Sequence, residues 1–253
     1  MTQAEPDDLR CELERHGFTS VLHVAGTIDL DTSPQLRTAF LKCLADEPDL
    51  IVIDLAAVRH VADVSLTIFP ALARHAGTWP GSPVALAGAR PPLVNALDRL
   101  AVCREMPRYA SASAAVAQAD RLATPSRLRL ELPPTLGSTA QSRAMVARAC
   151  ASWELLHLSE IAQLIVTELV SNVIRHARTA MEVSVSLRKR YLHLAVRDSS
   201  FAPPRRGGSD EPLREQGRGL LVIEALTMGW GWSPTDQGKV VWATLRTARD
   251  GVR

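Results

Sequence analysis

The pattern of apolar and polar residues differs between the two halves of the chain. The first half shows short apolar runs separated by amphipathic segments. Strands are expected at residues 21–25, 50–54 and 84–87, and helices at residues 34–45, 91–100 and 112–122. Short buried strands that alternate with helices are typical of an α/β domain.

The second half has a different order of elements. After a short strand at residues 128–132, we expect two helices, an alternating hairpin at 181–187 and 191–196, a polar segment at 199–216, a helix at 220–228 and a strand at 240–245. Ser138-Thr-Ala-Gln141 predicts a capping box for the first helix, and Ser159 a cap for the second. Proline-containing stretches flank the strand at 128–132, which places a domain boundary near residue 124 and predicts domains at 1–123 and 124–253.

Composition narrows the possible functions. The chain has 253 residues, of which 46% are hydrophobic, enough for two small domains with their own cores. Its net charge of +2 gives no electrostatic case for binding nucleic acid or an anionic membrane. No apolar run approaches the ~20 residues that a membrane span needs, and the acidic N-terminus is the opposite of a signal peptide. We therefore expect a cytoplasmic protein.

The four cysteines give no sign of a metal site or a disulfide framework. Cys11, Cys43, Cys103 and Cys150 are far apart in the chain, and none belongs to a C-x-x-C pair. We expect reduced thiols, as is usual in the cytosol.

The strongest chemical signal lies at residues 168–177. Glu168, Asn172 and His176 recur at every fourth position, so an α-helix would align them along one face. The other side of this segment is apolar. Asn172 offers a neutral oxygen to a hard cation, and Glu168 offers a carboxylate that can take a proton from a nucleophile. The alternative is a solvated helix face.

The segment Glu168-Leu-Val-Ser-Asn172-Val-Ile-Arg-His176-Ala177 resembles the N-box of the Bergerat-fold ATPases. The sequence of this segment is most similar to the N-box of the small anti-sigma-factor serine kinases of Gram-positive bacteria. The resemblance continues through Gly238-Lys-Val-Val-Trp242 and covers about residues 126–247. It implies an α/β sandwich that binds ATP and Mg²⁺, with Asn172 holding Mg²⁺, Glu168 as the catalytic base and His176 at the ATP site.

Two further motifs follow the N-box in the order that this family shows. Asp198 comes at the end of a strand, where the family's carboxylate accepts a hydrogen bond from the adenine amino group; the alternative is an ordinary turn residue. The family's second glycine box implies ATP contacts from Gly217, Arg218, Gly219 and Leu220. One position departs from the pattern, because Ser200 stands where the family's D-x-G motif has glycine.

The first half resembles a STAS domain, the fold of anti-sigma-factor antagonists. The matching stretches are residues 24–29, 50–55 and 58–65. In that family the second serine of a D-S-S-G turn is phosphorylated by a partner kinase, and the turn here reads Asp63-Val64-Ser65-Leu66. Ser65 is therefore the candidate phosphoacceptor. The alternative is that Asp63 or Ser65 only caps the helix that follows.

The two resemblances together predict an N-terminal α/β domain of STAS type followed by a Bergerat-fold, α+β ATPase domain. The implied function is regulation of a sigma factor by partner switching, with serine kinase activity toward a STAS serine in this chain or another. Ser200 and Leu66 instead favour an ATP-binding switch or scaffold without catalysis. A sensor histidine kinase is disfavoured, because no long helix with a phosphoacceptor histidine precedes the ATPase segment. The implied partners are a sigma factor and STAS-domain proteins, with homodimerisation or an intramolecular pairing as further expectations.

Overall fold

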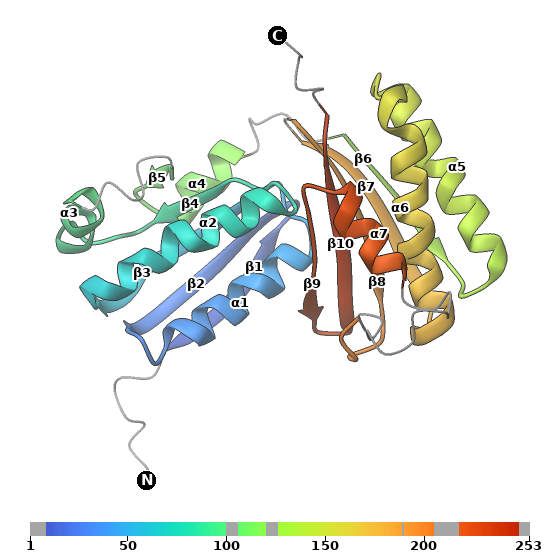
Figure 1. Cartoon of the computed structure of the whole chain (residues 1–253). Coiled ribbons are helices and arrows are strands. Elements are labelled where there is room, and N and C mark those ends of the chain that lie inside the picture. Colours follow the sequence, from blue (N-terminus) through green and yellow to red (C-terminus); the bar gives the residue numbers. More distant parts are fainter. Residues whose placement is uncertain (1–8, 100–105, 120–125, 189, 205–217, 248–253) are drawn as a thin grey trace. The chain divides into compact units, whose positions relative to one another are not determined.

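The computed structural model describes residues 9–99, 106–119, 126–188, 190–204 and 218–247. The chain divides into two compact units, Met1–Thr124 and Pro125–Arg253 (Figure 1). Each unit contains one five-stranded sheet.

The sheet of the first unit has the strand order β1-β2-β3-β4-β5. Its strands are β1 (Arg10–His16), β2 (Thr19–Ile28), β3 (Leu50–Val61), β4 (Val84–Ala87) and β5 (Arg108–Tyr109). β1 is antiparallel to β2, and the remaining neighbours are parallel. The three predicted strands lie within β2, β3 and β4. β1 and β5 were not predicted. They lie at the two edges of the sheet, where one row of backbone groups needs no partner strand and charged side chains are common.

Helices cover both faces of this sheet. They are α1 (Ser33–Ala45), α2 (Ile68–Thr78), α3 (Pro91–Arg99) and α4 (Ala112–Ala119), and a 3-10 turn, Asp63–Thr67, precedes α2. Figure 1 shows α1 and α2 together in front of the strands and α4 behind them. Ala115 of α4 packs in one cluster with Val21 of β2 and Val52 of β3.

The sheet of the second unit is antiparallel throughout, with the order β6-β7-β8-β10-β9. Its strands are β6 (Ser126–Leu132), β7 (Met181–Arg188), β8 (Tyr191–Asp198), β9 (Gly229–Thr235) and β10 (Gly238–Arg246). The predicted hairpin is formed by β7 and β8. β9 was not predicted, because glycine and proline are unfavourable in strands and Pro234 fits only an edge position such as this one.

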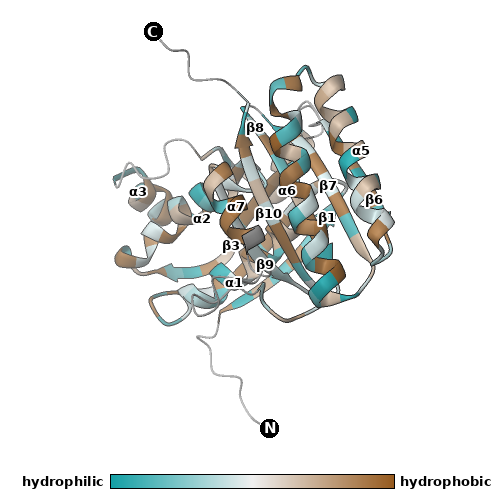
Figure 2. Cartoon of the chain, turned by 45° about the vertical axis from the view of Figure 1, so that its right-hand side comes forward, coloured by the Kyte–Doolittle hydropathy of each residue, from teal (hydrophilic) through white to brown (hydrophobic). Residues whose placement is uncertain are grey.

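Three helices cover one face of this second sheet (Figure 1). They are α5 (Leu136–Ser152), α6 (Ser159–Asn172) and α7 (Arg218–Leu226). Figure 2 shows hydrophobic and hydrophilic residues alternating along α5 and α6, as expected for helices with one buried face. Ile165 and Leu169 of α6 are buried with Val183 and Val196 of the sheet and Ile223 of α7 in one core cluster. This core holds α6 against the strands.

Both predicted helix caps in this unit were wrong. α5 begins at Leu136, and the Ser138 hydroxyl donates to the Pro133 carbonyl (2.6 Å) rather than capping the helix. Ser159 is the first helical residue of α6, and its hydroxyl accepts a hydrogen bond from the Gln163 side-chain amide (3.0 Å). In both cases the serine bonds a different local partner.

Within the described residues, no helix is both long enough and apolar enough to span a lipid bilayer.

Candidate functional site

The predicted polar stripe lies on helix α6 and on the turn that follows it, which is not α-helical. Glu168 and Asn172 lie on α6, and His176 lies on a π-helical turn, Val173–Ala177, that continues it. The turn ends at Arg178, whose backbone is left-handed with φ of 56°. A π turn adds one residue to a helical turn and occurs frequently at functional sites.

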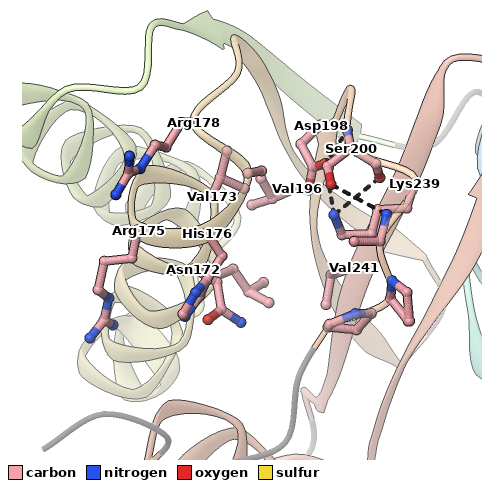
Figure 3. Close-up of a pocket in the computed structure, with 15 residues that line it drawn as sticks. Asn172, Val173, Arg175, His176, Arg178, Val196, Asp198, Ser200, Lys239 and Val241 are labelled. Atoms are coloured by element: carbon pink, nitrogen blue, oxygen red, sulfur yellow. Dashed lines mark hydrogen bonds and ion pairs between the residues drawn. The ribbon is translucent and has the colours of Figure 1, made fainter.

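A cavity of about 360 Å³ lies between this turn and strands β8 and β10. Its volume falls within the range of small-molecule sites. Asn172 and His176 line it from the helix side and Asp198 from the strand side, so three of the predicted residues meet around one cavity (Figure 3). In Figure 3, Arg175 and Arg178 extend away from the strands. Val196 and Val241 form an apolar part of the cavity wall.

Asp198 is the last residue of β8, and its carboxylate is held by two donors. Oδ1 accepts the Ser200 backbone N–H at 2.8 Å and the Lys239 ammonium at 2.9 Å. The side chains of Lys239 and Asp198 are 8% and 1% exposed, respectively, so this is a buried ion pair. The Ser200 contact is the turn bond that an aspartate commonly makes two residues on, so Asp198 also fills the alternative role of a turn residue.

Ser200, at the position where the family has glycine, fits into this turn. Its backbone carbonyl accepts a second hydrogen bond from Lys239 (3.2 Å), and its hydroxyl accepts the Ala202 N–H (3.3 Å). Ser200 also lines the cavity. The extra side chain is therefore accommodated by local hydrogen bonds.

Gly238 allows β10 to begin close to Asp198. Its φ is +149°, and an added Cβ would lie 2.1 Å from the Asp198 carbonyl oxygen. No other residue type fits there without moving one of the two strands. Gly238 therefore helps to place the next residue, Lys239, beside the carboxylate.

The predicted base, Glu168, lies one helical turn before Asn172 and is not among the residues that line the described cavity. Oε2 of Glu168 lies 3.8 Å from Nη2 of Arg175. The Nε of Arg175 donates a hydrogen bond to the Ser171 carbonyl (3.2 Å). The side chain of Glu168 is 24% exposed, so solvent and a substrate can reach it.

The second glycine box is described only in part. Gly217 lies outside the described residues, and α7 begins directly after it at Arg218, two residues earlier than predicted. Leu220 is 4% exposed and belongs to the core cluster, so its side chain packs inside the domain rather than in the cavity.

Ser65 lies in the 3-10 turn that precedes α2, in the first unit. It is 3% exposed, and its Oγ has no hydrogen-bond partner among the described residues. The neighbouring Val64 is 59% exposed. No side-chain cap hydrogen bond is present at the start of this turn or of α2, so the capping alternative is wrong. The turn would have to open for Ser65 to react.

The described cysteines are poor nucleophiles. Cys11, Cys43 and Cys150 are free, and Cys103 lies outside the described residues. Burial raises the pKa of Cys11 to about 11 and that of Cys43 to about 12, so both remain thiols at neutral pH.

Lys239 and Arg175 are site residues that were not predicted from the sequence. Lys239 was read only as part of a closing strand, and its role depends on β10 pairing with β8 so that Lys239 faces Asp198 across the ladder. Arg175 lies within the N-box segment, where its spacing of seven from Glu168, two helical turns, was an available signal.

Comparison with known proteins finds a family model that matches part of each unit. A family model for the histidine kinase-like ATPase domain matches residues 132–245, and a model described as Mlab, STAS domain matches residues 11–104. A segment of 72 residues is 36% identical to the anti-sigma-F factor antagonist RsfB of Mycobacterium tuberculosis, covering 28% of this chain and 59% of that protein. The chain thus spans about three fifths of the length of the curated relatives it matches.

Two solved structures are similar to part of the chain. An anti-sigma factor antagonist from Mycobacterium paratuberculosis has 27% sequence identity and a TM-score of 0.42, with 47% of this chain and 100% of that chain covered. The anti-sigma factor antagonist SpoIIAA in its unphosphorylated form has 14% identity and a TM-score of 0.39, with 46% and 100% covered.

Proposed function

Because this chain joins a STAS domain to a histidine kinase-like ATPase domain, we propose that it is an ATP-binding, partner-switching regulator with serine protein kinase activity. The observation that carries the proposal is the cavity in which Asn172 and His176 face Asp198. These are the residue types that the resemblance assigns to the nucleotide, and they come from two segments of the chain, α6 with its π-helical turn and strand β8.

The residues around the cavity fit Mg-ATP. Oδ2 of Asp198 has no hydrogen-bond partner among the described residues, so it is available to accept the adenine amino group. Asn172 supplies a neutral amide oxygen of the kind that Mg²⁺ accepts alongside phosphate and water. The resemblance assigns Gly217, Arg218 and Gly219 to the phosphates, for which glycine backbone N–H groups and the positive charge of an arginine are suited.

The proposed reaction transfers the γ-phosphoryl group of ATP to a serine hydroxyl. A bond forms between the serine oxygen and the γ-phosphorus, the bond to the β-phosphate oxygen breaks, and ADP leaves. Glu168 accepts the proton of the serine hydroxyl, and Arg175 holds its carboxylate in place. Mg²⁺, when bound, neutralises charge on the phosphates, and the remaining contribution is positioning.

We propose a STAS serine as the substrate, either Ser65 of this chain or the equivalent serine of another protein. Two findings support this class of substrate: a 72-residue segment is 36% identical to an anti-sigma-F factor antagonist, and a STAS-domain model matches residues 11–104. A sigma factor is the proposed downstream partner, which implies a cytoplasmic location. Homodimerisation and a STAS–kinase pairing within one chain belong to the same proposal.

The test is intact and peptide mass spectrometry after incubation of the purified chain with Mg-ATP and a STAS-domain acceptor. Wild type is expected to add one phosphate to a STAS serine. Glu168→Gln should slow transfer at least about a hundredfold while leaving ATP affinity nearly unchanged. Glu160→Gln is the matched control, because Glu160 is exposed in the first turn of the same helix. Equal inertness of wild type and Glu168→Gln would exclude catalysis.

The second candidate function is an ATP-binding switch without phosphoryl transfer. Two observations favour it: Ser200 replaces the expected glycine at the cavity wall, and Nη2 of Arg175 lies within ion-pair distance, 3.8 Å, of Glu168 Oε2. A switch would bind ATP and change partner affinity when Glu168 is mutated to Gln as well as in wild type. Sigma-factor or antagonist binding with and without ATP therefore separates the two functions.

A further inference from the structure

Lys239 is a buried cation at the wall of the proposed nucleotide cavity. It is 6% exposed, and it is the second residue of β10, directly opposite the last residue of β8. A buried ammonium group is costly unless it is paired and hydrogen-bonded. Lys239 meets this requirement through Asp198 Oδ1 at 2.9 Å and the Ser200 carbonyl at 3.2 Å.

These contacts leave unused hydrogen-bonding capacity on both partners. A lysine ammonium has three N–H donors, of which Asp198 and Ser200 take two. On the carboxylate, Oδ1 accepts both described donors, and Oδ2 accepts none from the described residues. Both side chains line the cavity, and Figure 3 shows them side by side. The cavity wall therefore presents a cationic donor next to an anionic acceptor.

This pair is complementary to the edge of adenine. Adenine presents an amino donor at N6 next to an acceptor at N1. We propose that Lys239 is a base-reading residue, which donates to adenine N1 while Asp198 accepts from the N6 amino group. The inference rests on the proposed nucleotide function of the cavity.

The same arrangement would reject guanine in the same orientation. Guanine places the O6 acceptor where adenine has its amino group, and an N1–H donor where adenine has an acceptor. The O6 acceptor would face the carboxylate of Asp198, and the N1–H donor would face the ammonium of Lys239. Both contacts would therefore be repulsive. Selectivity gained from mismatched polar groups is larger than selectivity gained from shape alone.

The experiment changes one atom of the ligand and one side chain of the protein. Calorimetric titration would compare ATP, 1-deaza-ATP, in which N1 is replaced by C–H, and GTP, each with Mg²⁺, against the full-length chain. In wild type we expect 1-deaza-ATP to bind about tenfold more weakly than ATP. In Lys239→Met the two should bind equally, and the preference for ATP over GTP should fall by about tenfold.

Two further variants control for folding. Lys239→Arg keeps the buried charge, and Lys42→Met removes an exposed lysine of α1 far along the chain from the cavity residues. The comparison of ATP with 1-deaza-ATP on wild type needs no variant at all. If wild type binds ATP but binds 1-deaza-ATP with the same affinity, the proposed role of Lys239 is wrong and the nucleotide site still stands. Failure of wild type to bind ATP would overturn the site itself.

Discussion

Arg175 Nη2 lies 3.8 Å from Glu168 Oε2, so the candidate catalytic base is paired with an arginine two helical turns further along the chain. The same guanidinium is tied by its Nε to the Ser171 carbonyl. This second contact gives the arginine one preferred position. The described ion-pair partner of Glu168 therefore comes from its own helical segment.

Replacing Arg175 by alanine should slow phosphoryl transfer about tenfold or more, because a displaced base meets the serine hydroxyl in the wrong position. ATP affinity should fall less than the rate, because Arg175 borders the cavity but extends away from the strands that hold Asp198 (Figure 3). Single-turnover kinetics and calorimetry separate the two effects, and Arg175→Lys should restore part of the rate. Faster transfer in Arg175→Ala would mean that the arginine restrains the base instead.

Asn172→Ala should weaken Mg-ATP binding about tenfold or more, because the amide oxygen proposed for Mg²⁺ is lost. Binding of ATP in the presence of EDTA should change far less. Gln163→Ala provides the control, since Gln163 lies on the same helix and its side-chain amide donates to the Ser159 hydroxyl, away from the cavity residues. Unchanged Mg-ATP affinity in Asn172→Ala would remove the basis for a nucleotide site here.

Ser65→Ala should abolish phosphorylation of the peptide that contains Ser65, while the domain becomes equally or more stable. The hydroxyl is buried without a described partner, so its removal relieves a desolvation cost of about 1 kcal/mol. Thr67→Ala tests the same turn, whose Thr67 hydroxyl donates to the Val64 carbonyl (3.0 Å), and should leave phosphorylation intact. Mass spectrometry and thermal unfolding provide the two readouts. Phosphate on that peptide in Ser65→Ala would identify a different acceptor.

The stability of the first unit should depend on pH through His23. Its Nε2 lies 2.9 Å from Glu14 Oε2, and its Nδ1 lies 2.9 Å from Asp54 Oδ2. Only the protonated ring can donate to both carboxylates, and these hydrogen bonds, first that to Glu14, raise the pKa of His23. The raised pKa stabilises the folded state fully below the unfolded value of about 6.5, and this contribution disappears as the pH rises through the folded pKa.

Urea unfolding of wild type and His23→Gln over about pH 6 to pH 9 tests this pH dependence. The destabilisation caused by His23→Gln should be larger at the acidic end of the range and shrink toward the alkaline end. His60→Gln, a change at an exposed position of β3, should show no such trend. A difference that stays constant across the range would contradict the role of the His23 network.

Local patterns were sufficient to predict much of the fold. The hairpin of β7 and β8 follows from strict alternation of apolar and polar residues, and helix α6 follows from its apolar repeat and polar stripe. The edge strands β1 and β9 were missed, because an edge strand carries charged, glycine or proline residues that obscure the pattern. The cap residues were also wrong, because a serine hydroxyl has several local partners of similar energy.

The sequence by itself determined which residue types belong to the site, since the spacing of Glu168, Asn172 and His176 and the position of Asp198 after a strand are properties of the chain. Only the tertiary structure decided what Asp198 meets. Lys239 lies 41 positions away, and it reaches the carboxylate through the register of β10 against β8, which no local pattern encodes. The burial of Ser65 was decided in the same way, because the exposure of a side chain depends on what packs over it.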